Sequence, residues 1–526
     1  MIQSGYLLTI SFLAAVGYFA ALWISGYSRR PKGTRKLPGP KGVPIVGNLL
    51  QIQSRHSWLQ FKAWADNYGP IFCLKLGLRE HVVISSEAIA NELLRERGNI
   101  YSSREQVPMA AELLSHNLRP LLLPYNDRWR RVRKFMHQLT MPRVAATYEP
   151  SQSLESKRLV YNLLRDPTNI ALHLQLYSGG LIFRIGYGKR LKSHEEPYLR
   201  RIIQVNHNLE RIASPGSYLV DTIPLLKHLP TWLAPFKQEA ARLHAKEVGL
   251  FRELIDNVRE ERHQYNAKPC FALTLLEDQE RFELTDDEGA YAVGTMFEAG
   301  SGTTSAAMLN FVFAMTHYPE WQTPLWEELD RVCGNRIPEF TDIPELPTVR
   351  AVIKETMRWR PVTAGGVPHQ LTKDDVYDGY FLRAGTMVHA NQWAIHRDPK
   401  LYPDPETFNP TRWLSKEFPT YSEPLSKFPN LQNFTAFGSG RRICPGMNIA
   451  ERSLYILTAR IAWACKISKK RDSAGQEIPV PLYDYTAGFN TEPNPWSFEL
   501  VARNKEREEA IIKAWEEAMD TDPLSS

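Results

Sequence analysis

Residues 437–446 (FGSGRRICPG) hold one cysteine, Cys444, in a glycine-rich loop directly before a long apolar segment. That segment, Met447–Ala464, combines helix formers with apolar residues at helical spacing, which predicts a helix that begins just after the cysteine. The unpaired amides and the positive dipole end of a helix start stabilise anions. We therefore expect a lowered thiol pKa and a thiolate, the form that binds iron. A single cysteine before a helix is otherwise most often a buried structural residue.

Other residues of the loop suit a large flat ligand. Gly438, Gly440 and Gly446 would let the backbone turn tightly and approach such a ligand closely. Arg442, two residues before Cys444, would place its guanidinium on a carboxylate of the ligand. The combination favours a ligand-binding loop over a structural cysteine.

This loop resembles the haem-binding motif F-x-x-G-x-R-x-C-x-G of the cytochrome P-450 family. All five fixed positions match, and they are Phe437, Gly440, Arg442, Cys444 and Gly446. The resemblance runs from about residue 38 to about residue 499 and is closest to membrane-bound enzymes of filamentous fungi. It implies a mainly α fold with small β-sheets, a haem b group with Cys444 as the axial iron ligand, and monooxygenase chemistry.

Size and charge limit the other classes of function. A chain of 526 residues without a linker-like interior break predicts one large domain with appendages. The formal net charge of +6 is small, and no basic run is interleaved with aromatic residues, so we expect no nucleic-acid partner. The five cysteines lack C-x-x-C spacing, which argues against a disulfide framework or a structural zinc site.

The N-terminus has the composition of a membrane anchor. Residues 1–28 contain no charged side chain, and Tyr6–Ile24 is nearly as long as the ~20 apolar residues that a membrane span needs. Basic residues follow this segment, which differs from a secretory signal peptide and predicts a cytosolic catalytic domain. We expect a single-pass transmembrane helix in the endoplasmic reticulum membrane, with a buried core helix as the alternative. The remaining expected domains are a basic, proline-rich hinge (29–48), the haem-thiolate catalytic domain (49–502) and a charged helical tail (503–526).

Two further segments match haem-contacting positions of the family. Trp129 and Arg133 lie four residues apart and would share one helix face. In the family this W-x-x-x-R pair reaches a haem propionate, although a solvated basic face is the alternative. His369 stands where the family has a second propionate-binding side chain, with a surface histidine as the alternative.

A long helix should carry the oxygen-binding side of the site. Thr285 and Glu288 form a capping box, and the helix can run to about Tyr318. Its centre, residues 297–304 (FEAGSGTT), resembles the oxygen-activation motif A-G-x-(D/E)-T-(T/S) of the family. That motif gives small residues the role of opening room over the iron, and a glycine packing notch is the alternative.

One position of this motif departs from the family pattern. The resemblance assigns the Thr303 hydroxyl a part in proton delivery, but Gly302 stands where an acid is usual. Glu298 lies four residues before Gly302 on the same helix face, so it is the candidate for the missing acid. A solvated or paired carboxylate is the alternative for Glu298.

A buried ion cluster is expected elsewhere. Glu355 and Arg358 stand three residues apart and can pair on one helix face. In the family an arginine of a P-x-R-F motif joins this pair, and Arg412 matches it, although Trp413 replaces the usual phenylalanine. We interpret the trio as structural.

The expected substrate contacts come from the same resemblance. They are Phe297, Ala299, Val362, Thr363, Val367 and Phe489. These residues indicate an apolar or aromatic substrate. The segment 359–369 looks like fungal enzymes of secondary metabolism, some of which hydroxylate small phenolic polyketides.

The sequence thus predicts a monooxygenase that inserts one atom of O2 into a small apolar substrate. No dinucleotide fingerprint follows a strand, so we expect electrons from NADPH–cytochrome P-450 reductase, with cytochrome b5 as a further candidate donor. Two alternatives stay open. The glycine at position 302 suits a peroxide-using or hydroperoxide-rearranging enzyme, and a non-enzymatic haem sensor would need only the haem loop.

Overall fold

The computed structural model describes residues 30–77, 79–214, 216–422, 431 and 434–524. Its backbone forms two compact units, each assembled from separate stretches of the chain. Unit 1 contains the described residues up to 105, with 365–395 and 439–442, and unit 2 contains the rest. The sequence predicted one large domain, because no linker-like composition marks the points where the chain passes from one unit to the other. The expected anchor, residues 1–28, lies outside the described residues, and none of the described helices is long and apolar enough to span a membrane.

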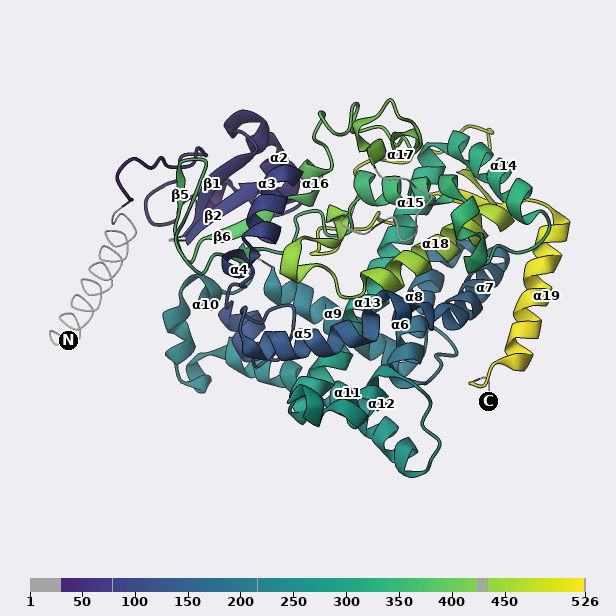
Figure 1. Cartoon of the computed structure of the whole chain (residues 1–526), viewed down its shortest axis with the longest axis horizontal. Coiled ribbons are helices and arrows are strands. Elements are labelled where there is room, and N and C mark those ends of the chain that lie inside the picture. The colour runs from purple at the N-terminus through teal and green to yellow at the C-terminus, as the bar shows by residue number, and fades with distance from the viewer. Residues whose placement is uncertain (1–29, 78, 215, 423–430, 432–433, 525–526) are drawn as a thin grey trace. The chain divides into compact units, whose positions relative to one another are not determined.

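Unit 1 is built on a four-stranded sheet in the order β1-β2-β6-β3, with a separate β4-β5 pair (Figure 1). β2 runs antiparallel to β1 and parallel to β6. The strands are β1 (Ile71–Leu76), β2 (Arg79–Ile84), β3 (His369–Gln370), β4 (Asp375–Tyr377), β5 (Tyr380–Leu382) and β6 (Met387–Ala390). The helices are α2 (Ser57–Tyr68), α3 (Glu87–Ala90), the π-helix η2 (Asn91–Glu96), α4 (Gly98–Tyr101) and α16 (Gln392–Ile395).

Both faces of this sheet are covered because successive side chains of a strand point to opposite sides. Phe72 and Leu74 of β1 pack with Phe61 of α2 in one apolar cluster. Ile71 belongs to a second cluster together with Leu93 of η2. The alternating burial therefore fixes which helix lies on which face.

Unit 2 is mainly helical. Its helices are α5 (Asp127–Thr140), α6 (Pro142–Ala146), α7 (Glu149–Arg165), α8 (Ile170–Tyr187), α9 (Pro197–Ala213), α10 (Leu219–Thr222), α11 (Pro235–His263), α12 (Phe271–Asp278), α13 (Asp286–His317), α14 (Gln322–Cys333), α15 (Pro347–Trp359), α17 (Thr411–Leu414), α18 (Met447–Ala464) and α19 (Lys505–Thr521). An antiparallel pair, β7 (Cys465–Lys469) and β8 (Phe498–Ala502), completes the unit. The two units together confirm the predicted mainly α fold with small sheets.

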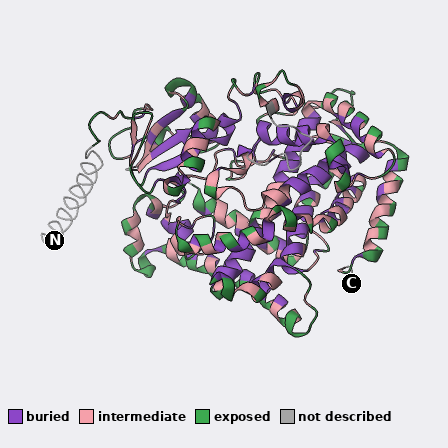
Figure 2. Cartoon of the chain, viewed as in Figure 1, coloured by how far each residue is buried: buried purple, intermediate pink, exposed green. Residues whose placement is uncertain are grey.

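Two buried helices organise unit 2. α13 contacts α8, α9, α11 and α18, and it begins at the predicted capping box of Thr285 and Glu288. α18 follows Cys444, has Gly446 at its N-cap, and is buried from Glu451 to its end (Figure 2). The predicted helix after the cysteine is thus present, and Cys444 lies directly before its first turn.

Candidate active site

The sulfur of Cys444 lies at the amino end of α18. The Cys444 amide donates a hydrogen bond to the Phe437 carbonyl at 2.9 Å, which closes the loop. Burial raises the pKa of the Cys444 thiol, while amides of Gly446 and Met447 and the charge of Arg133 lower it. The predicted effect of the helix start is therefore present, but burial outweighs it and the net pKa lies above the ordinary value.

The three loop glycines have different roles. Gly438 and Gly440 have φ angles of 84° and 61°, a region that side chains rarely adopt. A Cβ at Gly440 would also lie 2.0 Å from the Leu94 carbonyl oxygen of unit 1. Gly446 has φ −81°, and an added Cβ would only reach ordinary contact with the Cys444 sulfur, at 3.9 Å. The backbone of Gly446 thus adopts a conformation that any residue can adopt, so the turn does not require glycine there, and its close approach to a ligand stays a prediction.

α5 brings two predicted haem contacts to the cysteine loop of unit 2. The Asn126 side chain caps this helix by accepting a hydrogen bond from the Trp129 amide. Trp129 is buried, and Arg133, one turn later, donates a hydrogen bond to the Ile443 carbonyl. Burial lowers the pKa of Arg133, and the charge of the neighbouring Cys444 acts in the opposite direction and raises it. Arg133 of the predicted pair thus contacts Ile443, the residue that precedes the cysteine.

A cationic cluster lies in unit 1. Arg442 donates from Nε to the Ser102 carbonyl at 2.7 Å, and His369 bonds through Nδ1 to the Tyr101 carbonyl at 2.8 Å. The third member, Arg104, was not predicted from the sequence, and it donates to the carbonyls of residues 367 and 368. No periodic pattern marks Arg104, because its partners lie more than 260 positions away.

The electrostatics of this cluster favour an anionic ligand. Burial lowers the pKa of Arg104 to about 9. Burial also lowers the pKa of His369 well below its ordinary value, and the charges of Arg104 and Arg442 lower it further. Because a carbonyl can only accept, His369 donates from Nδ1, so its Nε2 can donate to a carboxylate only in the imidazolium form. A carboxylate placed here would stabilise the protonated forms of Arg104, His369 and Arg442.

The centre of α13 has one open face. Ala299 is exposed and Gly300, Gly302, Thr303 and Thr304 are half-buried, in a helix that is otherwise buried from residue 288 to residue 316. A Cβ added at Gly302 would meet no described atom within 4 Å. The Thr303 hydroxyl donates to the Ala299 carbonyl at 3.0 Å. This face has the room that the sequence comparison predicted at the helix centre.

Two other residues of this stretch point elsewhere. A Cβ at Gly300 would lie 2.4 Å from Ile182 of α8, so Gly300 is a packing notch. Phe297 is fully buried and packs on Phe183 and Tyr187 of α8, with ring centroids 5.4 and 5.9 Å from its own. The prediction that Phe297 contacts substrate is corrected, because its position on the helix directs it into the core.

Glu298 belongs to a buried ion cluster. Arg119 pairs with Glu298 through one nitrogen and with Glu247 of α11 through another, and all three side chains are buried. Asn206 of α9 donates to the Glu298 carbonyl at 3.0 Å and to the Ser301 hydroxyl at 3.1 Å. The alternative of a paired carboxylate therefore describes Glu298 in this structure. Arg119 and Glu247 were missed because they lie far from Glu298 along the chain.

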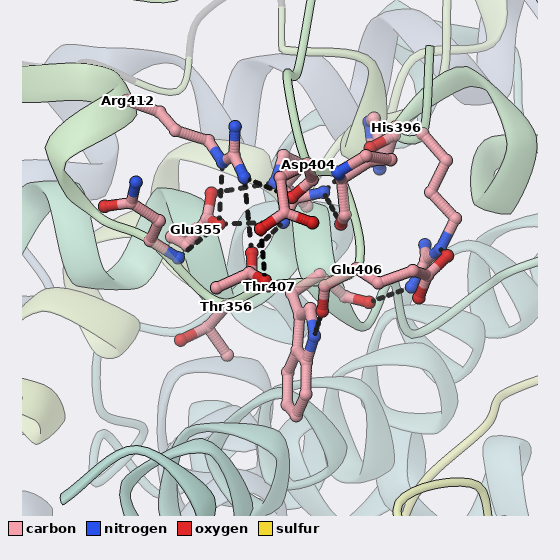
Figure 3. A network of polar contacts seen from close by, with 12 residues as sticks. Glu355, Thr356, His396, Asp404, Glu406, Thr407 and Arg412 are labelled. Atoms are coloured by element: carbon pink, nitrogen blue, oxygen red, sulfur yellow. Dashed lines mark hydrogen bonds and ion pairs between the residues drawn. The ribbon is translucent and has the colours of Figure 1, made fainter. Parts of the chain in front are cut away.

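The second buried cluster has the predicted composition (Figure 3). Glu355 accepts hydrogen bonds from Arg358 at 2.7 and 2.8 Å and from Arg412 at 3.3 Å. Trp413, which replaces the usual phenylalanine, donates its indole N–H to Glu355 at 3.1 Å. Burial lowers the pKa of Arg358 but the charge of Glu355 raises it above the ordinary value. The departure from the family motif thus adds an indole donor to the cluster.

Three other expected substrate contacts of unit 2, Val362, Thr363 and Phe489, lie on two adjoining segments. The Val362 carbonyl accepts from the Thr491 amide at 2.7 Å, and the Thr363 hydroxyl donates to Asn490 at 3.2 Å. Phe489, on the second segment, is 38% exposed. The remaining predicted contact, Val367, belongs to unit 1 and accepts from Arg104 there.

Two carboxyl groups near these segments were not predicted. An added Cβ at Gly488 would lie 3.4 Å from Glu210 Oε2 of α9. Burial raises the pKa of Glu210, and burial followed by the charge of Glu210 raises the pKa of Glu492. These groups add polar partners beside the exposed Phe489.

Comparisons with known proteins agree with this geometry. The sequence profile of the cytochrome P-450 family matches residues 37–480. The chain is 36% identical to cytochrome P-450 monooxygenase virE of Hypocrea virens, over 94% of this chain and 90% of that protein. It is 35% identical to cytochrome P-450 monooxygenase fogE of Aspergillus ruber, over 97% and 95%. A zebra fish cytochrome P-450 structure with progesterone, 24% identical, shares the fold with a TM-score of 0.69 over 85% of this chain and 99% of that chain.

The donor set of this structure fits the family's cofactor. A cysteine at a helix start suits the thiolate ligand of haem iron, and the cationic cluster of unit 1 suits carboxylates such as haem propionates. Members of the family are monooxygenases that use O2, a small-molecule substrate and a redox partner. The profile match and the long alignments at 35–36% identity show that this chain belongs to the cytochrome P-450 family of haem-thiolate monooxygenases.

Proposed function

We propose that this enzyme hydroxylates or oxidises a small apolar or aromatic compound of fungal secondary metabolism, such as a phenolic polyketide intermediate. The open face of α13 at Ala299, Gly302 and Thr303 is the observation that carries the proposal. Val362 and Phe489 provide apolar surface in the same unit. The fungal origin of the relatives supports the substrate class.

The substrate should also carry a hydroxyl group. Glu210 and Glu492 are partly buried carboxyl groups beside Phe489, and Thr363 and Asn490 lie on the adjoining segments. Buried carboxyl groups are stabilised by hydrogen-bond donors. A phenol or alcohol supplies such a donor while keeping the rest of the molecule apolar.

The residue roles follow the family motif. When bound, the haem supplies the activation of O2, with its iron held by the Cys444 thiolate. In unit 2 we assign propionate contacts to Trp129 and Arg133 and shaping of the loop to Phe437. In unit 1 we assign propionate contacts to Arg104, His369 and Arg442, and Gly440 permits the turn of the loop.

Proton delivery is assigned to Thr303. Its hydroxyl donates a hydrogen bond to the Ala299 carbonyl and can rotate to other partners. The ion pair between Glu298 and Arg119 supports a charge-balancing role for Glu298, and its role as the acid stays a prediction. The lack of an acid at Gly302 favours one second candidate, a peroxide-using or hydroperoxide-rearranging enzyme. Turnover that needs O2 and NADPH would exclude this second candidate.

We further propose attachment to the endoplasmic reticulum membrane through residues 1–28, with the catalytic domain in the cytosol. The uncharged apolar segment and the basic residues after it support this topology. NADPH–cytochrome P-450 reductase would then supply electrons from the same membrane, with cytochrome b5 as a further donor. Deletion of residues 1–28 should release the haem-loaded protein from the membrane fraction.

The test of the proposed function begins with the iron ligand. Cys444→Ser should abolish the strongly red-shifted Soret band of the reduced carbon monoxide complex. Cys73→Ser changes a cysteine of similar exposure and should keep it. The substrate class is tested by comparing metabolites of a deletion strain with those of its parent. Accumulation of a hydroxylated aromatic that the purified enzyme oxidises with NADPH, reductase and O2 is expected, and an unchanged metabolite profile would contradict the proposal.

A further inference from the structure

A basic pocket of about 470 Å³ lies in unit 2 among α7, α8, the segment after α8, and α19. Arg158, Arg190 and Lys192 line it, together with His173, His194 and Trp515. None of the lining residues, all in the described part of the chain, is acidic. A pocket of this size can hold a small molecule.

Arg190 is the least satisfied cation of this pocket. Its side chain is only 7% exposed, and the Nε atom has no hydrogen-bond partner among the described residues. Its Nε atom lies 3.7 Å from a carboxylate oxygen of Asp522, and its guanidinium lies 5.4 Å from the centre of the Trp515 ring. A buried guanidinium nitrogen without a hydrogen-bond acceptor is costly, and the ion pair with Asp522 is too long to supply one, so this arrangement favours a further anion.

The neighbouring charged groups already have partners. Asp522 pairs in bidentate fashion with Arg184, which leaves it at a distance from Arg190. Arg158 donates to two backbone carbonyls and pairs with Glu155. The buried set therefore holds three arginines and two carboxylates.

The rim of the pocket is mixed in charge. His173 lies near Asp166, and His194 lies near Glu195, so neither histidine adds to the excess of positive charge. Lys192 is exposed, and no ion pair of its side chain is found within the described residues. Arg190 and Lys192 are thus the two cations available to a ligand.

We propose that this pocket binds a phosphate monoester or pyrophosphate group through Arg190 and Lys192. Arginine and lysine together are the usual partners of phosphate oxygens. Trp515, Leu176 and Met519 form an apolar wall that accommodates the rest of the ligand. Both a soluble phosphorylated metabolite and a lipid headgroup present this group. The site lies outside the residues assigned to haem and substrate.

The test is titration calorimetry of the full-length haem-loaded protein with pyrophosphate and with adenosine monophosphate at low salt. Arg190→Gln should weaken binding at least tenfold and Lys192→Glu several-fold. Lys466→Gln, an exposed lysine of β7 outside the pocket, is the control and should bind as the wild type does. The carbon monoxide spectrum of each variant verifies that the haem protein is folded.

A second arm identifies the source of the phosphate. Sedimentation with phosphatidate vesicles, compared with neutral vesicles, should depend on Arg190 only if a lipid headgroup is the ligand. Binding of either probe that is lost in Arg190→Gln supports the site. No binding of any probe, or equal binding by the wild type and both pocket variants, would overturn it.

Discussion

Two buried ion clusters of unit 2 have opposite compositions. Around Glu355, one carboxylate faces the guanidinium groups of Arg358 and Arg412. Around Arg119, one guanidinium faces two carboxylates, those of Glu247 and Glu298. Both clusters remove three charged side chains from water. They differ in which groups stabilise the unbalanced charge, which is positive around Glu355 and negative around Arg119.

In the Glu355 cluster, backbone carbonyls accept hydrogen bonds from the two guanidinium groups. Arg358 donates to the carbonyls of His396 and Pro405, and Arg412 donates to those of Pro403 and Asp404 (Figure 3). These bonds fix several loop segments around one carboxylate. We infer that this cluster is a rigid support.

The Arg119 cluster lacks such support. Glu247 Oε1 has no hydrogen-bond partner among the described residues, although Arg119 itself also donates to the Ser115 hydroxyl. The cluster joins the segment of Arg119 to α11 and to α13, one turn before the open face at Gly302. We infer from the unpartnered carboxylate oxygen that this is the more adjustable of the two clusters.

Removal of the single carboxylate should have the largest effect. Glu355→Gln leaves two buried guanidinium groups without a counter-charge, and we expect the free energy of unfolding to fall by ~3–5 kcal/mol. Urea unfolding followed by haem absorbance and circular dichroism measures this loss. Glu516→Gln changes an exposed residue of α19 and should be neutral. A loss below about 1 kcal/mol would mean that the backbone carbonyls alone stabilise both arginines.

Removal of the single guanidinium tests the other cluster. Arg119→Met leaves Glu247 and Glu298 buried without a cation, and we expect a loss of about 3 kcal/mol in the free energy of unfolding. The double variant Arg119→Met with Glu298→Gln should recover part of this loss, because one buried charge is removed as well. A double-mutant cycle measures the coupling, and strict additivity would contradict direct pairing.

Acid should act on the cation-rich cluster through His396. Burial, followed by the charges of Arg358 and Arg397, lowers the pKa of His396 to about 3. The unfolded chain, with an ordinary pKa, binds this proton at higher pH, so stability is lost as pH falls below about 6.5. Between pH 6.5 and pH 5 the wild type should lose about 2 kcal/mol more than His396→Gln. Parallel curves of unfolding free energy against pH for the two proteins would contradict the assignment.

The smallest effect is expected from Glu298→Gln on catalysis. If Glu298 only balances Arg119, product formed per NADPH should stay within about twofold of the wild type. Thr303→Ala should lower it, because a positioned proton donor contributes ~10²- to 10⁴-fold in rate. Assays with saturating reductase compare the two variants. An equal loss in both would restore Glu298 as the acid that Gly302 lacks.

Local spacing explains which parts of this molecule could be predicted. The helix after Cys444, the capping box of α13 and the pairing of Glu355 with Arg358 all depend on residues within a few positions. Arg119 and Glu298 lie 179 positions apart, so no periodic pattern of the sequence predicts that they pair.

Helix faces were a second source of error. Motif matching placed Phe297 at the substrate because it lies next to the oxygen-activation motif, but the twist of α13 turns it toward α8. Predicting this would have required knowing the packing partner of the helix in advance.

The two glycines of the α13 centre have a consequence for protein engineering. A Cβ at Gly300 would lie 2.4 Å from a side-chain carbon of Ile182, so any side chain there would force Ile182 of α8 to move. Gly302 faces open space and tolerates a side chain. A library meant to change the substrate range should therefore randomise Ala299 and Gly302 and keep Gly300 constant, because variation at Gly300 would select for repacking around Ile182 rather than for new specificity.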